Sequence, residues 1–83
     1  MKVKIGEGAY VWVSSSELKL IEKMSKTNNE MWFKDFTPED ISSKNTLVAK
    51  GLLFYDKRGD QTLYFLSKYA KILNNERNQK DNQ

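Results

Sequence analysis

Apolar residues recur at helical spacing in the segment that follows the first aromatic run of the chain. Leu18, Ile21 and Met24 lie three residues apart, and polar or charged residues occupy most positions between them. Ser14 precedes this pattern, with a glutamate three positions later, which is the sequence signature of a capping box. We therefore expect an amphipathic helix over residues 15–26.

Two aromatic-rich segments flank this predicted helix. Residues 9–13 are mostly aromatic or β-branched and predict a short strand. After the helix, Thr27 followed by Glu30 repeats the capping signature and favours a short helix at about 28–35. The aromatic density of the same segment also suits a sheet, so a strand at Met31–Phe33 is the alternative.

A further helix start is marked by Thr37, which is followed by a proline and two acidic residues. We expect this helix to run over 38–50, with Gly51 as the residue that ends it. One residue fits the apolar pattern poorly, because on a straight helix Lys44 lies within about 60° of Ile41. Either the lysine extends its ammonium to water, or the helix breaks near it.

Two β-rich runs, 52–55 and 62–66, are separated by a short charged connection that contains a glycine. This arrangement predicts a β-hairpin. With Arg58–Gly59 as the tip, Phe54 would lie opposite Leu63 on the dry face of the hairpin.

The last apolar repeat predicts a helix over residues 67–74, and the polar residues 75–83 are expected to form a disordered tail. The chain is thus predicted to hold one domain, residues 1–74. Its core is expected to contain Leu18, Ile21, Ile41, Val48, Phe54, Leu63, Phe65 and Leu73.

Composition narrows the possible chemistry. The chain has 83 residues and contains neither cysteine nor histidine, which excludes thiol catalysis, Cys/His zinc sites and imidazole acid–base chemistry. No nucleophile–base pair, metal-ligand cluster or glycine-rich phosphate loop is present, so we predict no enzymatic activity, no metal and no cofactor. No apolar run is long enough for a membrane span and no signal peptide is recognised, which fits a cytoplasmic protein.

The net charge of +3 is concentrated in one central segment. Residues 41–59 hold four basic residues against Asp56 alone, whereas residues 1–40 hold six lysines against seven acids. A local cationic excess of this kind is typical of a surface that contacts nucleic acid.

The order of predicted elements resembles that of winged helix-turn-helix domains. The most specific feature is the joint Leu47-Val48-Ala49-Lys50-Gly51-Leu52, which looks like the L-x-x-x-G-L pattern at the end of their recognition helix. The resemblance covers roughly residues 15–73. It implies an α+β fold with a short N-terminal strand, three helices, a β-hairpin wing and a C-terminal helix.

This resemblance implies a small, dimeric transcriptional regulator that binds double-stranded DNA, with the third helix in the major groove and the wing at 56–61 on the backbone. The helical wheel turns Ser42, Ser43, Thr46 and Lys50 away from the Ile41/Val48 side. The candidate DNA-binding residues are Ser42, Ser43, Lys44, Asn45, Thr46, Lys50, Lys57 and Arg58.

The alternative function is a non-catalytic module that binds a host protein such as RNA polymerase or a nuclease. The mild charge and the aromatic-rich first half favour it, and the small Lys/Asn-rich composition is typical of phage or mobile-element proteins. The aromatic residues are interpreted as core rather than as a base-stacking platform, because nothing in the sequence orders them with basic residues. They are Tyr10, Trp12, Trp32, Phe33 and Phe36.

Overall fold

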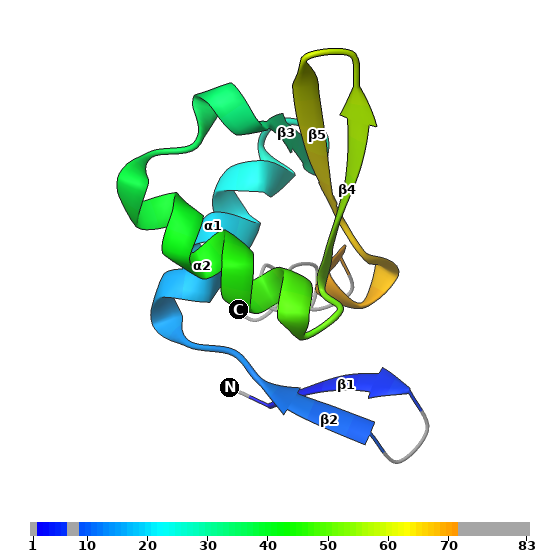
Figure 1. The fold of residues 1–83 in the computed structure, drawn as a ribbon. Helices are drawn as coiled ribbons and strands as arrows, with labels where there is room; N and C mark the ends of the chain where they lie inside the picture. The colour runs from blue at the N-terminus through cyan, green and yellow to red at the C-terminus, as the bar shows by residue number, and fades with distance from the viewer. Residues whose placement is uncertain (1, 7–8, 72–83) are drawn as a thin grey trace.

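The computed structural model describes residues 2–6 and 9–71, which form a small α+β fold (Figure 1). Helices α1 and α2 lie against one face of a three-stranded antiparallel sheet with strand order β3-β5-β4, and β1 and β2 form a separate hairpin. The elements are β1 Lys2–Gly6, β2 Ala9–Trp12, α1 Ser15–Ser25, β3 Glu30–Trp32, the 3₁₀ helix η1 Phe33–Asp35, α2 Pro38–Ala49, β4 Leu53–Arg58 and β5 Gln61–Leu66.

Helix α1 begins where the capping signature predicts. The Ser14 hydroxyl accepts a hydrogen bond from the Glu17 backbone N–H at 3.2 Å, and the Ser14 N–H donates to the Glu17 carboxylate at 2.8 Å. These two bonds satisfy amide groups that have no partner within the helix. The predicted helix is confirmed, with its end one residue earlier.

The segment after α1 does not form the helix predicted over 28–35. Thr27 does not act as a cap, because its hydroxyl donates to the carbonyl of Met24 and makes a 2.6 Å contact with that of Glu30. Asn28 and Asn29 both have positive φ angles, 64° and 65°, a conformation that asparagine tolerates better than most residues. The chain turns there and pairs as β3 with β5, so the alternative of a strand is the correct one.

Helix α2 is continuous and ends at the predicted glycine. Gly51 has a φ of +76°, and its N–H donates to the Val48 carbonyl at 3.1 Å. The N–H of Leu52 donates to the Leu47 carbonyl at 3.0 Å, and both leucine side chains are fully buried. This is a Schellman motif with its apolar contact. The helix does not break at Lys44, whose side chain remains half-buried.

The predicted hairpin is present, but its register and its dry face differ from the prediction. Its two-residue loop is Gly59-Asp60, because Gly59 takes a φ of +65° that other residues rarely adopt. Phe54 therefore lies opposite Phe65 rather than Leu63, and it is 50% exposed. The helices cover the opposite face of the hairpin, which carries Leu53, Tyr64 and Leu66.

The core lies between the two helices and the inner face of this sheet. Of the predicted core residues, Ile21 is fully buried in it, and Leu18, Ile41 and Val48 pack partly buried against it. Phe54 and Phe65 lie on the outer face, Leu63 is buried outside this cluster, and Leu73 lies outside the described residues. The cluster consists of Val13, Leu20, Ile21, Met24, Met31, Phe36, Leu47, Leu52, Leu53, Tyr64, Leu66 and Ala70.

The predictions for the two ends of the chain are confirmed only in part. The predicted strand 9–13 is observed as β2, but it pairs with β1 in its own sheet rather than lying beside the 53–66 hairpin. A helical turn at 68–71 begins at Ser67, whose hydroxyl accepts a hydrogen bond from the Ala70 N–H at 3.4 Å. The rest of the helix predicted over 67–74 and the tail 75–83 lie outside the described residues.

The assignment of the inner and outer sheet faces leads to a stability prediction. We expect Leu47→Ala to lower the free energy of unfolding by about 2–5 kcal/mol, because it opens a cavity in the core. Phe54→Ala should cost clearly less, since half of this side chain is exposed. Urea unfolding of both variants measures the difference, and a larger loss for Phe54→Ala would show that the outer face is the buried one.

Candidate nucleic-acid interface

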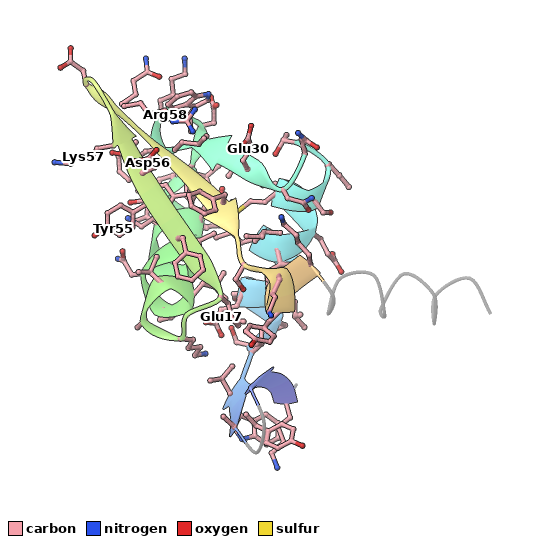
Figure 2. All side chains as sticks on the ribbon, turned by 90° about the vertical axis from the view of Figure 1, so that its right-hand side faces the viewer. Glu17, Glu30, Tyr55, Asp56, Lys57 and Arg58 are labelled. Atoms are coloured by element: carbon pink, nitrogen blue, oxygen red, sulfur yellow. The ribbon has the colours of Figure 1, made fainter. Side chains whose placement is uncertain are left out.

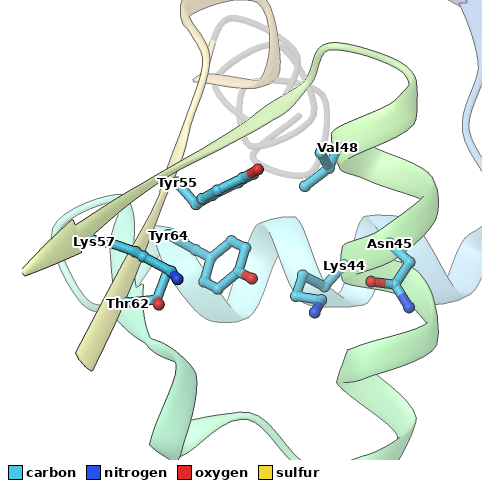
Figure 3. A pocket seen from close by; sticks show the side chains of 7 residues that line it. All are labelled: Lys44, Asn45, Val48, Tyr55, Lys57, Thr62 and Tyr64. Carbon is cyan, nitrogen blue, oxygen red and sulfur yellow. The ribbon is translucent and has the colours of Figure 1, made fainter. Parts of the chain in front are cut away.

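A pocket of about 350 Å³ lies between helix α2 and the inner face of the β4–β5 hairpin (Figure 3). It contains two lysine ammonium groups from different elements and no carboxylate, which makes it electropositive. The residues that line it are Lys44, Asn45, Val48, Tyr55, Lys57, Thr62 and Tyr64.

Aromatic rings hold one of the two lysines in place. The Lys44 ammonium lies 4.9 Å from the ring centroid of Phe33 and 5.2 Å from that of Tyr64. A cation at this distance is attracted to the negative face of an aromatic ring. Tyr64 is itself buried, and its ring packs against those of Phe36 and Tyr55 at 5.2 and 5.6 Å. The position of Lys44 is therefore fixed by packed rings, which explains how a lysine fits near the apolar side of α2.

The second lysine belongs to the hairpin. Lys57 and Tyr55 alternate along β4 and so project from the same face, toward α2. Both are exposed, and within the described part of the chain no carboxylate forms an ion pair with Lys57. Figure 3 shows Lys57 beside Thr62, its register partner on β5. The hairpin thus presents a cation, a hydroxyl and an aromatic ring to the pocket.

Arg58, the other predicted cation of the wing, faces the opposite side of the hairpin. Figure 2 shows Lys57 and Arg58 leaving β4 in different directions, as neighbouring strand residues do. The Arg58 guanidinium Nε lies 3.3 Å from the Asp56 carboxylate, and both side chains are more than half exposed. The structure does not bring Arg58 into the pocket.

Three predicted residues of α2 lie on the side of the helix that packs against α1. The Lys50 ammonium lies 2.7 and 2.9 Å from the two carboxylate oxygens of Glu17, and the Thr46 hydroxyl donates to the same carboxylate at 2.6 Å. Ser43 is buried, with 7% of its surface exposed. The outward orientation predicted from the helical wheel is therefore wrong for Ser43 and holds only in part for Lys50, because α1 packs against that side of α2, whereas Thr46 remains exposed.

Glu17, which the sequence indicated only as part of a helix cap, also joins α1 to α2. Its burial raises the pKa of the carboxyl group. Hydrogen bonds from Lys50, from the Ser14 backbone and from Thr46 outweigh that effect and lower the pKa to about 2. A buried carboxylate that stays ionised in this way needs its partners, so Glu17 fixes the rotation of α2 about its own axis.

A second ion pair joins the same two helices near their other ends. The Lys23 ammonium lies 2.6 Å from the Asp40 carboxylate. Burial raises the pKa of Asp40, but the bonds from Lys23 and Thr37 lower it overall. With α2 held at both ends, Lys44, Asn45 and Val48 face the hairpin, while Ser42 remains exposed to solvent.

Of the predicted site residues, the structure brings Lys44, Asn45 and Lys57 together. Sequence reasoning missed Tyr55, Thr62 and Tyr64, which complete the pocket. The alternation of Leu53, Tyr55 and Lys57 in β4 is a signal that could have found part of it, because these residues share one face of a strand.

A second pocket, of about 320 Å³, has the opposite electrostatic character. Glu30 and Asp35 both line it, and the ammonium of its lysine, Lys23, is already paired with Asp40. The ring of Trp32 and the side chain of Leu63 also line it. An anionic phosphate would be repelled there, so this pocket is not part of the candidate interface.

Two further features bear on the class of function. Among residues 2–6 and 9–71, no cluster of three acidic, cysteine or histidine side chains could hold a metal ion. In the same residues, no helix has the length and apolar character that crossing a membrane requires.

The ionisation of Glu17 predicts how stability depends on pH. The pKa of Glu17 is lowered in the folded state from its ordinary value of 4.5. The ionised carboxylate should therefore stabilise the protein above pH 4.5, and this contribution should be lost as the pH falls toward 2. The expected loss is about 3 kcal/mol by pH 2, of which about 2 kcal/mol falls between pH 7 and pH 3. Glu17→Gln should remove most of this pH dependence, as measured by urea unfolding between pH 7 and about pH 3.

Asp40→Asn is the matched control, since Asp40 also has a lowered pKa but lies in a more exposed pair. It should leave most of the acid-dependent loss in place. A Glu17→Gln variant that keeps the full pH dependence of the wild type would contradict the role given to this carboxylate.

Comparison with known proteins adds no relative to these observations: no protein-family model matches the chain, and no curated protein or solved structure matches it significantly.

Proposed function

We propose that this chain is a small DNA-binding transcriptional regulator of the winged-helix type, with α2 directed at the major groove and the β4–β5 hairpin at the backbone. The observation that carries the proposal is the pocket between these two elements. Lys44 of α2 and Lys57 of β4 both line it, and no carboxylate does. Two cations supplied by two separate elements suit successive phosphates of a duplex.

The neutral groups of the pocket support phosphate binding as well. The side chain of Thr62 and the hydroxyl of Tyr55 are donors of the kind that position a protein on a nucleic-acid backbone. The hairpin's acidic Asp56 projects from the other face of β4, away from these donors. An anion in the pocket would therefore meet donors and cations only.

The exposed side of α2 carries small residues. Ser42, Asn45 and Ala49 are exposed there, which lets the helix backbone approach a groove closely. An asparagine side chain can form two hydrogen bonds with the edge of an adenine. Asn45 therefore serves as the base-reading residue, whereas Thr46 and Lys50 position the helix through Glu17.

The element order is consistent with the proposed domain type. Helix α1, the short helix η1, helix α2 and the β4–β5 hairpin follow one another, with η1 in the place of the second helix. The pocket between α2 and the hairpin offers only two lysines, Lys44 and Lys57, so one copy would bind DNA weakly. We therefore propose that the protein acts on DNA as a homodimer.

A protein-binding module is the second candidate function. Phe54 is 50% exposed on the outer face of the sheet, and its ring lies 6.0 Å from that of Phe65. Exposed aromatic residues of this kind are enriched at protein–protein interfaces. This surface would be available to a partner whether or not the pocket binds DNA.

Replacement of the two pocket lysines tests the DNA proposal. We expect Lys44→Gln combined with Lys57→Gln to weaken binding to all duplex sequences about equally. The slope of log affinity against log salt should fall by about two units, because two phosphate contacts are lost. Fluorescence anisotropy with a random-sequence duplex at increasing salt measures both effects.

Lys26→Gln provides the matched control, since Lys26 is exposed at the end of α1 and does not line the pocket. It should leave the salt slope of the wild type nearly unchanged. If the wild type binds no duplex more tightly than about 10⁻⁴ M at low salt, the DNA proposal is wrong.

Asn45 provides a separate prediction about sequence preference. Asn45→Ala should change the preferred sequence at about one base pair while lowering non-specific affinity little, because an asparagine carries no charge. Selection of bound duplexes from a random pool, with the wild type and the variant in parallel, measures this. Identical preferences would contradict a base-reading role.

A further inference from the structure

The β1–β2 hairpin, which we call the arm, carries two of the most exposed aromatic side chains of the described chain. Tyr10 is 54% and Trp12 is 66% exposed. The two residues alternate along β2 and therefore share one face of the arm. The expectation that they belong to the core is wrong. Figures 1 and 2 show the arm below the helices and the main sheet, at the opposite end from the tip of the β4–β5 hairpin.

Strand pairing brings the basic residue Lys2 to these aromatics. Lys2 is the register partner of Trp12, and its ammonium lies 5.3 Å from the ring centroid of Tyr10. Lys4 is the register partner of Tyr10. The sequence separates each lysine from its aromatic partner by several residues, so the pattern becomes visible only once the strands pair. Cations beside aromatic rings are the combination that single-strand binding proteins use.

The other side of β2 explains why this face remains uncovered. Val11, between the two aromatics, is partly buried against the core, and Val13 is almost fully buried in it. These valines attach the base of the arm to the body of the protein. Because successive side chains of a strand point in opposite directions, Tyr10 and Trp12 face away from that attachment.

We propose that this face of the arm binds single-stranded nucleic acid, with bases stacked on Tyr10 and Trp12 and phosphates held by Lys2. In a duplex, the faces of the bases are already stacked on one another and are not free to contact the rings. A single strand offers both an exposed base and a phosphate, and every base has a face that can stack. This site shares no residue with the α2–hairpin pocket and goes beyond the function proposed for it.

Charge favours this occupant over a second copy of the chain. The described residues of the arm, 2–6 and 9–12, include two lysines and no acidic residue, and Glu7 lies outside the described residues. Two copies joined through this face would bring lysines against lysines, which is unfavourable. A polyanion would neutralise the same charges.

The fluorescence of Trp12 can report binding directly. Trp12 and Trp32 are the two tryptophans of the chain, so Trp32→Phe leaves Trp12 as the single emitter. Titration of this variant with an oligothymidylate of about ten nucleotides should quench its emission, because stacked bases quench an indole. In the otherwise unchanged chain, Trp12→Leu should weaken oligothymidylate binding about tenfold, as measured by anisotropy.

Two further variants separate stacking and charge from a general loss of structure. Lys2→Gln should lower the salt slope for oligothymidylate by about 0.7, the value for one single-strand phosphate. Phe54→Leu replaces a comparably exposed aromatic on the other sheet and should leave the affinity unchanged. Equal losses in Phe54→Leu and Trp12→Leu would overturn the proposal.

The test also distinguishes the arm from the pocket. The Lys44→Gln, Lys57→Gln double variant should bind oligothymidylate as tightly as the wild type, and Trp12→Leu should keep its affinity for duplex. Absence of quenching at low salt would overturn the proposal for the arm alone. So would a concentration-dependent dimer, seen by sedimentation, that Trp12→Leu converts to monomer, because the arm would then be an interface between copies.

Discussion

A single buried carboxylate, that of Glu17, organises the helical half of this protein. It closes the N-terminal cap of α1 by accepting the Ser14 N–H, and it binds Thr46 and Lys50 of α2. An ionised carboxylate at 3% exposure is tolerated only because these donors surround it. The position of α2 relative to α1, and so the side that α2 offers to the sheet, depends on this group.

The character of the candidate interface follows from that constraint. Because Glu17 engages Lys50, the cationic charge that the central segment carries in sequence is divided in space. Lys50 is neutralised between the helices, Arg58 lies beside Asp56 on the other side of the hairpin, and Lys44 and Lys57 face a pocket without carboxylates. The local charge excess in the sequence indicated the right region of the molecule, but it overstated how many cations are available to a ligand.

The parts of the fold that could be predicted from sequence are those set by neighbouring residues. The capping boxes at Ser14 and Thr37 and the stop at Gly51 depend on contacts within a few positions, and all three form. Thr27 carries the same local signature, yet it begins no helix, because β3 gains a partner in β5 that lies more than thirty residues away in the chain. The covered face of the hairpin, the position of Lys57 toward α2 and the pairing of the arm likewise depend on distant partners, which a single sequence does not reveal.

The hydrogen bonds at the C-terminal end of β5 have a mechanical consequence. The Ser67 N–H donates to the Leu52 carbonyl at 3.1 Å, and the Leu66 N–H donates to that of Asn29 at 2.9 Å. The end of the hairpin is thereby tied both to the residue that follows α2 and to the turn that follows α1. Helix α2 and the base of the hairpin cannot separate without breaking these bonds. The strands that carry Lys57 and Thr62 therefore stay beside the helix that carries Lys44, and a ligand of the pocket meets both elements already in place.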